Sequence, residues 1–405
     1  MKKGRHPAPS RLSSLSALLV LTMLASLQLA IPISAAAAPR DASAVGKQLA
    51  ALLGSDIVAG DAFGVSVAVS GTTAVVGAPG YAKDVGRAYV FSETAGGWKQ
   101  VAELKGSNTV AGDFFGYSVG VSGTTAVIGV PGYAKNAGRV YVFAKTGSGW
   151  KQAAEFKGSD TVTNDYFGDS VAVSGTNAMV GGDGHSKTAG RAYVFSDASG
   201  SWKQAAELKG SDTVAKDGFG YAVAISGTTA ISGAPDHAKN EGRAYVFTDA
   251  AGSWKQVAEL KGSDSVANNG FGVAVGVSGS TAVAGAPGFS KAAGRAYVFE
   301  ASGSVWKQSA ELKGSDTAGS NDLGYSVGIS GDTVVAGAPG VAKNEGRSYL
   351  FSKTGPGWKQ AAEVKGSDSA GGDYFGYSVA ISDTAAIAGA DGHSKSAGRA
   401  YLFAS

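Results

Sequence analysis

The chain has 405 residues, with 35 Lys and Arg against 32 Asp and Glu, and it contains no cysteine. The absence of cysteine excludes disulfides, thiolate metal sites and a lipidated N-terminal cysteine. Four of the 35 basic residues precede residue 39, where there is no acidic residue, so 31 basic side chains face 32 acidic ones in the rest of the chain. This balance gives no indication of a nucleic-acid-binding or anionic-membrane surface.

The first 38 residues have the three parts of a secretory signal peptide: a basic start, an apolar stretch and small residues before a polar segment. Pro32 interrupts the apolar stretch and Ala35–Ala38 suits signal peptidase, so we predict cleavage between Ala36 and Ala38, followed by a short linker over residues 39–45. The alternative is a retained anchor, since the apolar stretch is nearly long enough to span a bilayer. With cleavage, the protein is secreted and extracellular or at the cell surface, without stable membrane insertion.

A 52-residue repeat follows the leader and extends over residues 46–405. Phe-Gly, or once Leu-Gly, recurs seven times at this spacing from Phe63 to Phe375. The six tryptophans keep the same period from Trp98 to Trp358. Strict self-similarity at such a period indicates a repeat architecture made of one supersecondary unit per repeat.

The segment GKQLAALLGSD at residues 46–56 resembles WKQVAELKGSN at residues 98–108 and begins 52 residues before Trp98. The last unit reaches Ser405 before a WKQ segment of its own. We therefore expect the opening segment to form the outermost strand of the last unit and so to close a ring. An open solenoid would instead need polar caps at both ends.

Each unit predicts four strands. In the first unit they cover residues 63–70, 73–79, 86–92 and 98–104, and glycine-containing turns or loops separate them. Four strands in a period of about 50 residues are typical of a β-propeller. The predicted fold is all-β: a seven-bladed β-propeller of four-stranded antiparallel blades, closed by the N-terminal strand.

Side-chain size orders the strands from the axis outward. The first strand alternates Phe and Val with Gly, Ala and Ser, so one face is small enough for neighbouring sheets to approach. The fourth strand carries Trp98 and charged residues such as Lys99 and Glu103, which suit an exposed edge. Gly46 stands in the tryptophan slot of the seventh blade, so we expect loose packing at that blade's outer edge.

Phe-Gly at the start of one strand and Gly-Ala-Pro at the end of the next form the pattern of the FG-GAP repeat. Gly-Ala-Pro stands at residues 77–79, 233–235, 285–287 and 337–339. Over residues 46–405 the chain resembles this family, whose fold is similar to the N-terminal seven-bladed propeller of integrin α subunits, and it looks closest to the secreted bacterial variety. The resemblance implies binding or cell adhesion through the loops of one propeller face.

Some units depart from the family pattern. GVP at residues 129–131, GGD at 181–183 and GAD at 389–391 replace Gly-Ala-Pro. Many family members carry a DxDxDG calcium loop between the first and second strands, but here that turn has at most one carboxylate. Calcium prefers six or more oxygen ligands, so we expect no metal or other cofactor. A cation held by Asp56 and Asp61 is the alternative.

Two slots are nearly invariant among the units. One holds arginine: Arg87, Arg139, Arg191, Arg243, Arg295, Arg347 and Arg399. The other, two residues before Phe-Gly, holds Asp61, Asp113, Asp165, Asp217, Asn269, Asn321 and Asp373. We predict structural arginine–carboxylate pairs between the two slots, which tie the loops of one rim together; a ligand site is the alternative. An invariant lysine, Lys83 in the first unit, is expected to form an exposed ring of charge.

The slot two residues before that lysine varies. It holds Tyr81, Tyr133, His185, His237, Phe289, Val341 and His393. This slot lies on the loop between the second and third strands, which faces the ligand in the integrin-like arrangement. Because recognition usually sits on loops of a rigid scaffold, these residues are candidates for a ligand-binding face. The alternative is that they pack over the blade, and both interpretations remain open.

Catalysis is not expected. His185, His237 and His393 are the histidines that follow the leader, and no Ser/His/Asp set or carboxylate pair can be assigned. We expect a monomeric, non-catalytic binding or adhesion module that recognises a protein or cell-surface glycan partner and no nucleic acid. One alternative is a lectin-like carbohydrate binder with several equivalent sites. Another is a hydrolase with a cryptic axial site.

Overall fold

The computed structural model describes residues 44–197 and 200–405. The signal peptide predicted for residues 1–38 and most of the linker predicted for residues 39–45 lie outside these ranges. None of the helices in the two described ranges has the length and hydrophobicity needed to span a bilayer.

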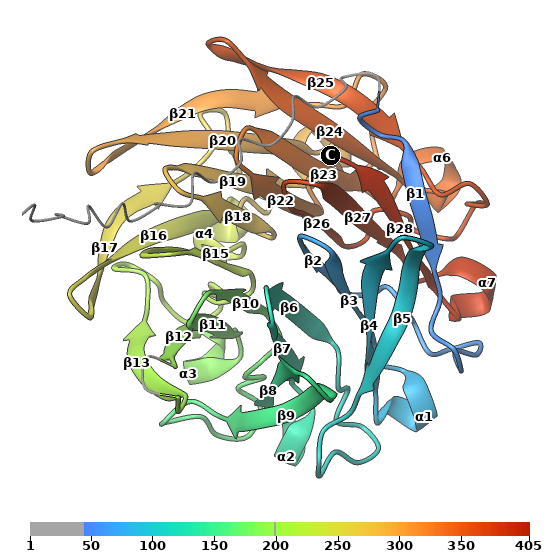
Figure 1. Ribbon diagram of the computed structural model, residues 1–405. Helices are drawn as coiled ribbons and strands as arrows, with labels where there is room; N and C mark the ends of the chain where they lie inside the picture. Colours follow the sequence, from blue (N-terminus) through green and yellow to red (C-terminus); the bar gives the residue numbers. More distant parts are fainter. Residues whose placement is uncertain (1–43, 198–199) are drawn as a thin grey trace, which may run out of the picture. The chain divides into compact units, whose positions relative to one another are not determined.

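Seven four-stranded antiparallel sheets form a seven-bladed β-propeller, which confirms the predicted fold (Figure 1). The first complete sheet pairs β2 (Val67–Ser70), β3 (Thr73–Ala78), β4 (Arg87–Thr94) and β5 (Gly97–Leu104) in chain order. Five further sheets repeat this order with the following strands: β6 (Ser118–Ser122), β7 (Thr125–Val130), β8 (Arg139–Thr146), β9 (Gly149–Phe156); β10 (Val171–Ser174), β11 (Asn177–Gly182), β12 (Arg191–Ser196), β13 (Lys203–Leu208); β14 (Val223–Ser226), β15 (Thr229–Ala234), β16 (Arg243–Ala250), β17 (Ser253–Leu260); β18 (Val275–Ser278), β19 (Thr281–Ala286), β20 (Arg295–Ser302), β21 (Val305–Leu312); β22 (Ser326–Ser330), β23 (Thr333–Ala338), β24 (Arg347–Thr354), β25 (Gly357–Val364).

The seventh sheet closes the ring. Its order is β1 (Gln48–Leu52), β28 (Arg399–Ala404), β27 (Ala385–Ala390) and β26 (Val379–Ile381). Figure 1 shows β1, coloured blue at the start of the described chain, beside β28, coloured red at its end. The predicted closure by the N-terminal strand is therefore confirmed.

The closing junction uses the same contacts as the junctions between other blades. Ser378 Oγ donates to the carbonyl oxygen of Gly64 at 2.7 Å, as Ser66 Oγ donates to the carbonyl of Gly116 at 2.8 Å. The side chain of Gln48 on β1 accepts a hydrogen bond from the backbone N–H of the linker preceding the seventh blade. The ring is therefore continuous in its hydrogen bonding across the two ends of the chain.

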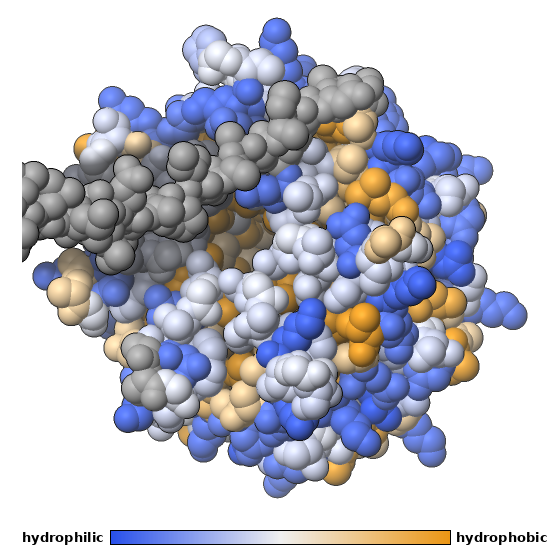
Figure 2. Space-filling view, viewed as in Figure 1, coloured by the Kyte–Doolittle hydropathy of each residue, from blue (hydrophilic) through white to orange (hydrophobic). Residues whose placement is uncertain are grey.

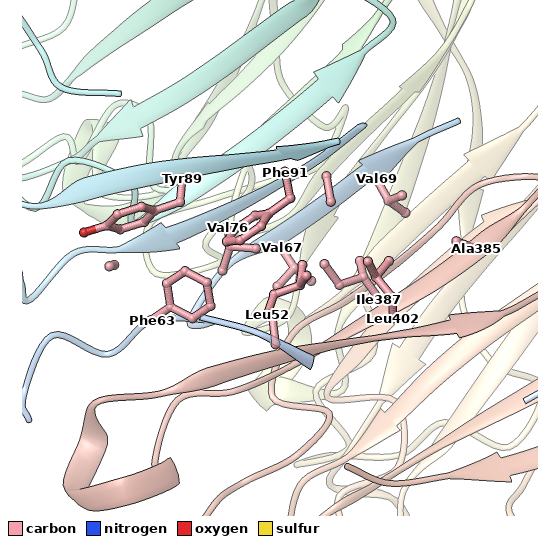
Figure 3. Close-up of a cluster of buried hydrophobic side chains, with 13 residues drawn as sticks. Leu52, Phe63, Val67, Val69, Val76, Tyr89, Phe91, Ala385, Ile387 and Leu402 are labelled. Atoms are coloured by element: carbon pink, nitrogen blue, oxygen red, sulfur yellow. The ribbon is translucent and has the colours of Figure 1, made fainter. Parts of the chain in front are cut away.

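Buried aromatic side chains fill the wedge between neighbouring blades. Between the seventh blade and the first, the Phe63 ring lies 5.6 Å from the Tyr89 ring and 6.1 Å from the Phe91 ring, edge to face (Figure 3). Leu52 and Leu402 of the seventh blade belong to the same cluster. Each fully buried side chain of this kind contributes about 2 kcal/mol of hydrophobic free energy. The Phe of each Phe-Gly pair is thus an inter-blade core residue.

The glycines of the repeat allow the blades to meet near the axis. A Cβ added to Gly77, the glycine of Gly-Ala-Pro, would lie 1.9 Å from the carbonyl oxygen of Gly116, the glycine of the next Phe-Gly pair. Gly116 itself has φ +87°. Only glycine combines this conformation with such close backbone approach.

Two expectations differ from the structure at strand level. Residues 63–66 were expected in the first strand, but β2 begins at Val67 because Phe63 pairs instead with Gly398 of the neighbouring blade. At the outer edge of the seventh blade, Val45 packs against the core where other blades place tryptophan. A Cβ on Gly46 would lie 2.7 Å from the Ala362 Cβ, so the loose packing expected there is not observed.

Seven four-residue turns, in which the second and third residues have positive φ, follow the second strands of the blades. They are α1 (Tyr81–Asp84), α2 (Tyr133–Asn136), α3 (His185–Thr188), α4 (His237–Asn240), α5 (Phe289–Ala292), α6 (Val341–Asn344) and α7 (His393–Ser396). Each turn bonds to the linker that enters the next blade: the Gly112 and Phe114 N–H groups, for example, donate to the Asp84 carbonyl. These turns and linkers build one face of the ring.

Candidate functional site

The aromatic residues of the predicted loop face pack beneath arginines. The Arg87, Arg139 and Arg295 guanidinium groups lie 4.7, 4.2 and 4.3 Å from the ring centroids of Tyr81, Tyr133 and Phe289, respectively. Such cation–π contacts hold both partners in place. All three aromatic side chains are partly buried.

The histidines of the same slot are held by carboxylates. His185 Nδ1 lies 2.9 Å from Asp165 Oδ2, and its Nε2 lies 3.6 Å from Asp160 Oδ2. His237 and His393 each contact the two equivalent aspartates of their own repeat unit. Val341 is also buried. All seven side chains of this slot therefore pack onto the blade tops, and a ligand contact to them stays a prediction.

The predicted pairs between the invariant arginines and the Asp61 slot are wrong. Arg87 Nη1 lies 2.5 Å from Glu103 Oε1 of the adjacent strand β5, and the first six arginines all pair with the equivalent glutamate, while Arg399 pairs with Asp368. The Asp61 carboxylate is turned inward instead, where it accepts the Val58 N–H at 2.9 Å. The arginine begins β4, beside the glutamate-bearing strand, and this adjacency decides its partner. Lys83 is exposed, as predicted.

A slot that we did not single out in the sequence surrounds the propeller axis. The residue after each Phe-Gly lines one channel formed by the innermost strands: Val65, Tyr117, Asp169, Tyr221, Val273, Tyr325 and Tyr377. Unlike the invariant slots, this one differs from unit to unit. Variation among near-copies was the signal that could have revealed it.

The channel widens into a cavity of about 470 Å³ on the face that carries the turns and linkers. Its wall combines Tyr117 and Tyr221 with Phe114 and Tyr166 from the linkers, and six of its thirteen lining residues are aromatic. Figure 2 gives a space-filling view of one face of the propeller, in which hydrophobic residues lie at the edge of a central hollow. A concave, largely aromatic site with few polar groups is the usual form of a ligand pocket.

Two of these aromatic residues occupy a backbone conformation that favours glycine. Phe114 and Tyr166, each directly before Phe-Gly, have φ of +59° and +54°. Two other units place glycine at this position, Gly218 and Gly270. An L-residue in the left-handed region costs about 1 kcal/mol, so the aromatic rings at the cavity wall are kept against a backbone preference.

A carboxyl pair supplies the polar part of the cavity. Asp169 precedes β10 and Asp183 follows β11, so the antiparallel pairing of these two strands brings their side chains together. Burial, the Asp183 charge and a hydrogen bond with Asp183 raise the pKa of Asp169 well above its usual value. Asp169 Oδ1 is buried and has no hydrogen-bond partner among the described residues. The raised pKa favours the protonated form of Asp169, and its Oδ1 remains an acceptor without a partner in the described chain.

The FG-GAP repeat family matches the chain seven times, over residues 47–91, 98–143, 150–195, 202–247, 254–299, 306–351 and 358–403. The chain belongs to the FG-GAP repeat family. The resemblance inferred from its motifs is thereby confirmed. No curated protein matches the chain. Among solved structures, the crystal structure of Saccharomyces cerevisiae Sqt1 aligns at 11% identity over 86% of this chain and 84% of that chain, with a TM-score of 0.44.

The tyrosines of this FG-GAP propeller present un-ionised hydroxyl groups to the cavity. Burial raises the pKa of Tyr117 to about 12 and also raises the pKa of Tyr221. The Tyr325 and Tyr377 rings lie 5.0 Å apart with a 44° tilt. Since no lysine or arginine lines the cavity in the described chain, its polar groups are hydroxyls, carboxyls and the Asn136 amide.

The described ranges contain no group of three or more His, Asp or Glu side chains placed to hold a metal ion. Asp56, proposed with Asp61 as a cation site, accepts hydrogen bonds from the hydroxyls of Tyr81 and Tyr89 at 2.8 and 2.7 Å. These bonds fix the linker to the first blade. In the FG-GAP propeller Asp56 and Asp61 thus serve the scaffold.

Proposed function

We propose that this FG-GAP propeller is a secreted, non-catalytic binding module that recognises a cell-surface partner through the axial cavity and the loops around it. The observation that carries the proposal is the convergence of blade-specific side chains on one cavity. A scaffold needs no variation at its axis, whereas one asymmetric recognition site does.

The loops around the cavity offer additional contact area. Val58, Val110, Val162 and Val214 are each 62% exposed, and Val266 is 61% exposed. They stand on the linkers that lead into Phe-Gly, the same segments that contribute Phe114 and Tyr166 to the cavity. Exposed apolar side chains repeated around one face support a partner larger than the group that enters the cavity.

An array experiment tests the proposal. The labelled protein is applied to an array of cell-surface glycans and to an array of random peptides, beside a variant with Tyr117→Ala and Tyr221→Ala. A matched control carries Val101→Ala and Val305→Ala, which change exposed side chains on the outer strands β5 and β21. We expect the cavity variant to lose at least about tenfold in signal and the control to keep it. Equal binding by all three proteins would overturn the proposal.

A second candidate function, hydrolysis at the same cavity, has one observation in its favour. Asp169 and Asp183 line the same cavity, and burial together with the Asp183 charge raises the pKa of Asp169, as happens in the carboxyl pairs of some hydrolases. Turnover of ester, glycoside or phosphate substrates that is lost in Asp169→Asn would establish this candidate in place of pure binding. Absence of turnover by a protein that binds on the arrays would leave the binding module as the function.

Secretion is part of the proposal and has its own test. Residues 1–38 have the composition of a signal peptide, so the protein collected from the medium of the producing cells should begin between residues 37 and 39. N-terminal sequencing of that protein checks the prediction. Recovery of the uncut chain with the membrane fraction would favour the retained anchor instead.

A further inference from the structure

We propose that the axial cavity binds one neutral sugar unit through a pair of adjacent hydroxyl groups, so that the partner is a glycan. This inference rests on the proposed binding function of the same cavity and specifies its ligand. It differs from a lectin with seven equivalent sites, because the cavity occurs once per ring and draws its residues from several blades.

The aromatic wall suits the apolar face of a sugar ring. Tyr117 and Tyr221 line the cavity and are 47% and 44% exposed, so their rings are accessible from it. Tyr325 and Tyr377 extend this wall as a tilted pair. The C–H groups of a pyranose pack on aromatic rings of this kind, while its hydroxyls point outward to polar partners. The volume of about 470 Å³ lies within the range of small-ligand pockets.

The carboxyl pair matches the chemistry of a vicinal diol. Each sugar hydroxyl both donates and accepts a hydrogen bond, and two carboxyl groups of which one is protonated offer both functions within a small space. Asp169 Oδ1 is a buried acceptor without a partner, and a sugar hydroxyl would satisfy it. Asn136 and Thr188 add an amide and a hydroxyl to the same wall. Two adjacent hydroxyls can therefore be held without unpaired polar groups.

The charge of the cavity selects among ligands. An anionic sugar would be repelled by the Asp183 carboxylate, with no lysine or arginine in the described lining to offset it. An ammonium or guanidinium ion would need the ionised form of Asp169, which burial disfavours by raising the pKa of that carboxyl. A neutral diol changes neither charge nor protonation, so the cavity favours neutral sugars over both charged classes.

The experiment measures binding of defined probes by calorimetry. The probes are the methyl glycosides of glucose, galactose, mannose and N-acetylglucosamine, the 2-deoxy analogue of the best of them, N-acetylneuraminic acid and Nα-acetylarginine amide. We expect one neutral glycoside to bind with one site per chain. Its deoxy analogue should bind at least about tenfold more weakly if the removed hydroxyl belongs to the bound pair. A 3-deoxy or 4-deoxy analogue tests the other pairs.

Two substitutions at equivalent positions of different blades serve as the test and its matched control. Asp183→Asn should weaken sugar binding at least about tenfold, because the amide replaces one acceptor oxygen of the carboxylate with an NH2 group that cannot accept a hydrogen bond from a sugar hydroxyl. Asp391 occupies the same slot in the seventh blade and does not line the cavity, so Asp391→Asn should leave binding unchanged. Thermal unfolding of both variants verifies that each is folded.

The outcomes separate this inference from the proposed function. Binding of a neutral sugar that is lost in Asp183→Asn and kept in Asp391→Asn supports the inference. Binding of acetylarginine amide or of array peptides at the cavity, without sugar binding, overturns the inference and leaves the binding module standing. If the cavity variants change no interaction on the arrays or in calorimetry, both proposals fail.

Discussion

The loop slot around the rim and the slot around the axis both vary from unit to unit, but the structure gives their variation different meanings. At the rim each side chain packs within its own blade, as Tyr133 does beneath Arg139 and His185 does beside Asp165. At the axis the seven side chains meet in one channel. Variation at the rim changes seven separate local contacts, whereas variation at the axis shapes a single site.

The largest loss of stability should come from a substitution in the strand that closes the ring, β1, which pairs with β28 in the seventh blade. Leu52 of β1 is buried between the seventh and first blades. Leu52→Asp would bury an unpaired carboxylate, so we expect the free energy of unfolding to fall by about 4 kcal/mol. Urea denaturation followed by tryptophan fluorescence measures this change.

Leu49 on the same strand is the control for Leu52, since 44% of its surface is exposed. Leu49→Asp should change the free energy of unfolding by less than about 0.5 kcal/mol. A similar loss in both variants would mean that β1 is intolerant of charge in general, and a loss in neither would contradict its place in the closing blade.

A smaller effect is expected where two blades touch near the axis. In Gly77→Ala the new methyl group would lie 1.9 Å from the Gly116 carbonyl oxygen, so the blades must move apart, at a cost of about 3 kcal/mol. Gly147, in the outer turn between β8 and β9, has open space around its Cβ position, so Gly147→Ala should be nearly neutral. Thermal unfolding of the two variants compares axis with rim. Equal melting temperatures would show that close approach at the axis is not required.

Asp391, which occupies the Asp183 slot in the seventh blade, should make the stability of the protein depend on pH. Burial raises the pKa of Asp391 to about 6, and its Oδ1 has no hydrogen-bond partner in the described chain. A raised pKa in the folded state means that this group favours folding when protonated, and that the advantage is lost as the pH rises from about 4 to about 6. Asp391→Asn should therefore raise the free energy of unfolding at pH 7 by about 2 kcal/mol and flatten its change across that window. Denaturation curves at pH 4, 5, 6 and 7 test this. An unchanged slope would contradict it.

Much of the fold follows from the sequence, because one period fixes most of it. The 52-residue spacing sets the number of blades, and the offset of the opening segment from Trp98 predicts the closing strand. The position where the first strand begins did not follow, since Phe63 pairs with Gly398 of the neighbouring blade. That contact forms only when the first and seventh blades come together, so no sequence pattern within one unit predicts it.

The site was harder to predict, for two physical reasons. Arg87 had two acidic candidates in reach by sequence, and only the pairing of β4 with β5 selects Glu103 over the inward-turned Asp61. The sequence shows Asp183 as a departure from Gly-Ala-Pro, but its proximity to Asp169 was not predicted. Extending the hairpin register that pairs Val171 with Val180 by two residues places Asp169 opposite Gly182, one residue before Asp183. The register therefore brings the two carboxyls into the same neighbourhood without pairing them directly.

The smallest expected effect on stability separates rim from axis most directly. Tyr133→Ser removes a partly buried ring and its contact with Arg139, so the free energy of unfolding should fall by about 1 kcal/mol while binding at the axis is kept. Tyr221→Ser changes a side chain that is 44% exposed, so stability should change by less than about 0.5 kcal/mol. Its binding should nevertheless fall at least about tenfold. Denaturation and array binding are measured on both variants. Loss of binding in Tyr133→Ser with binding kept in Tyr221→Ser would instead place recognition on the rim loops, because a side chain that serves only to pack on its own blade should not affect ligand binding.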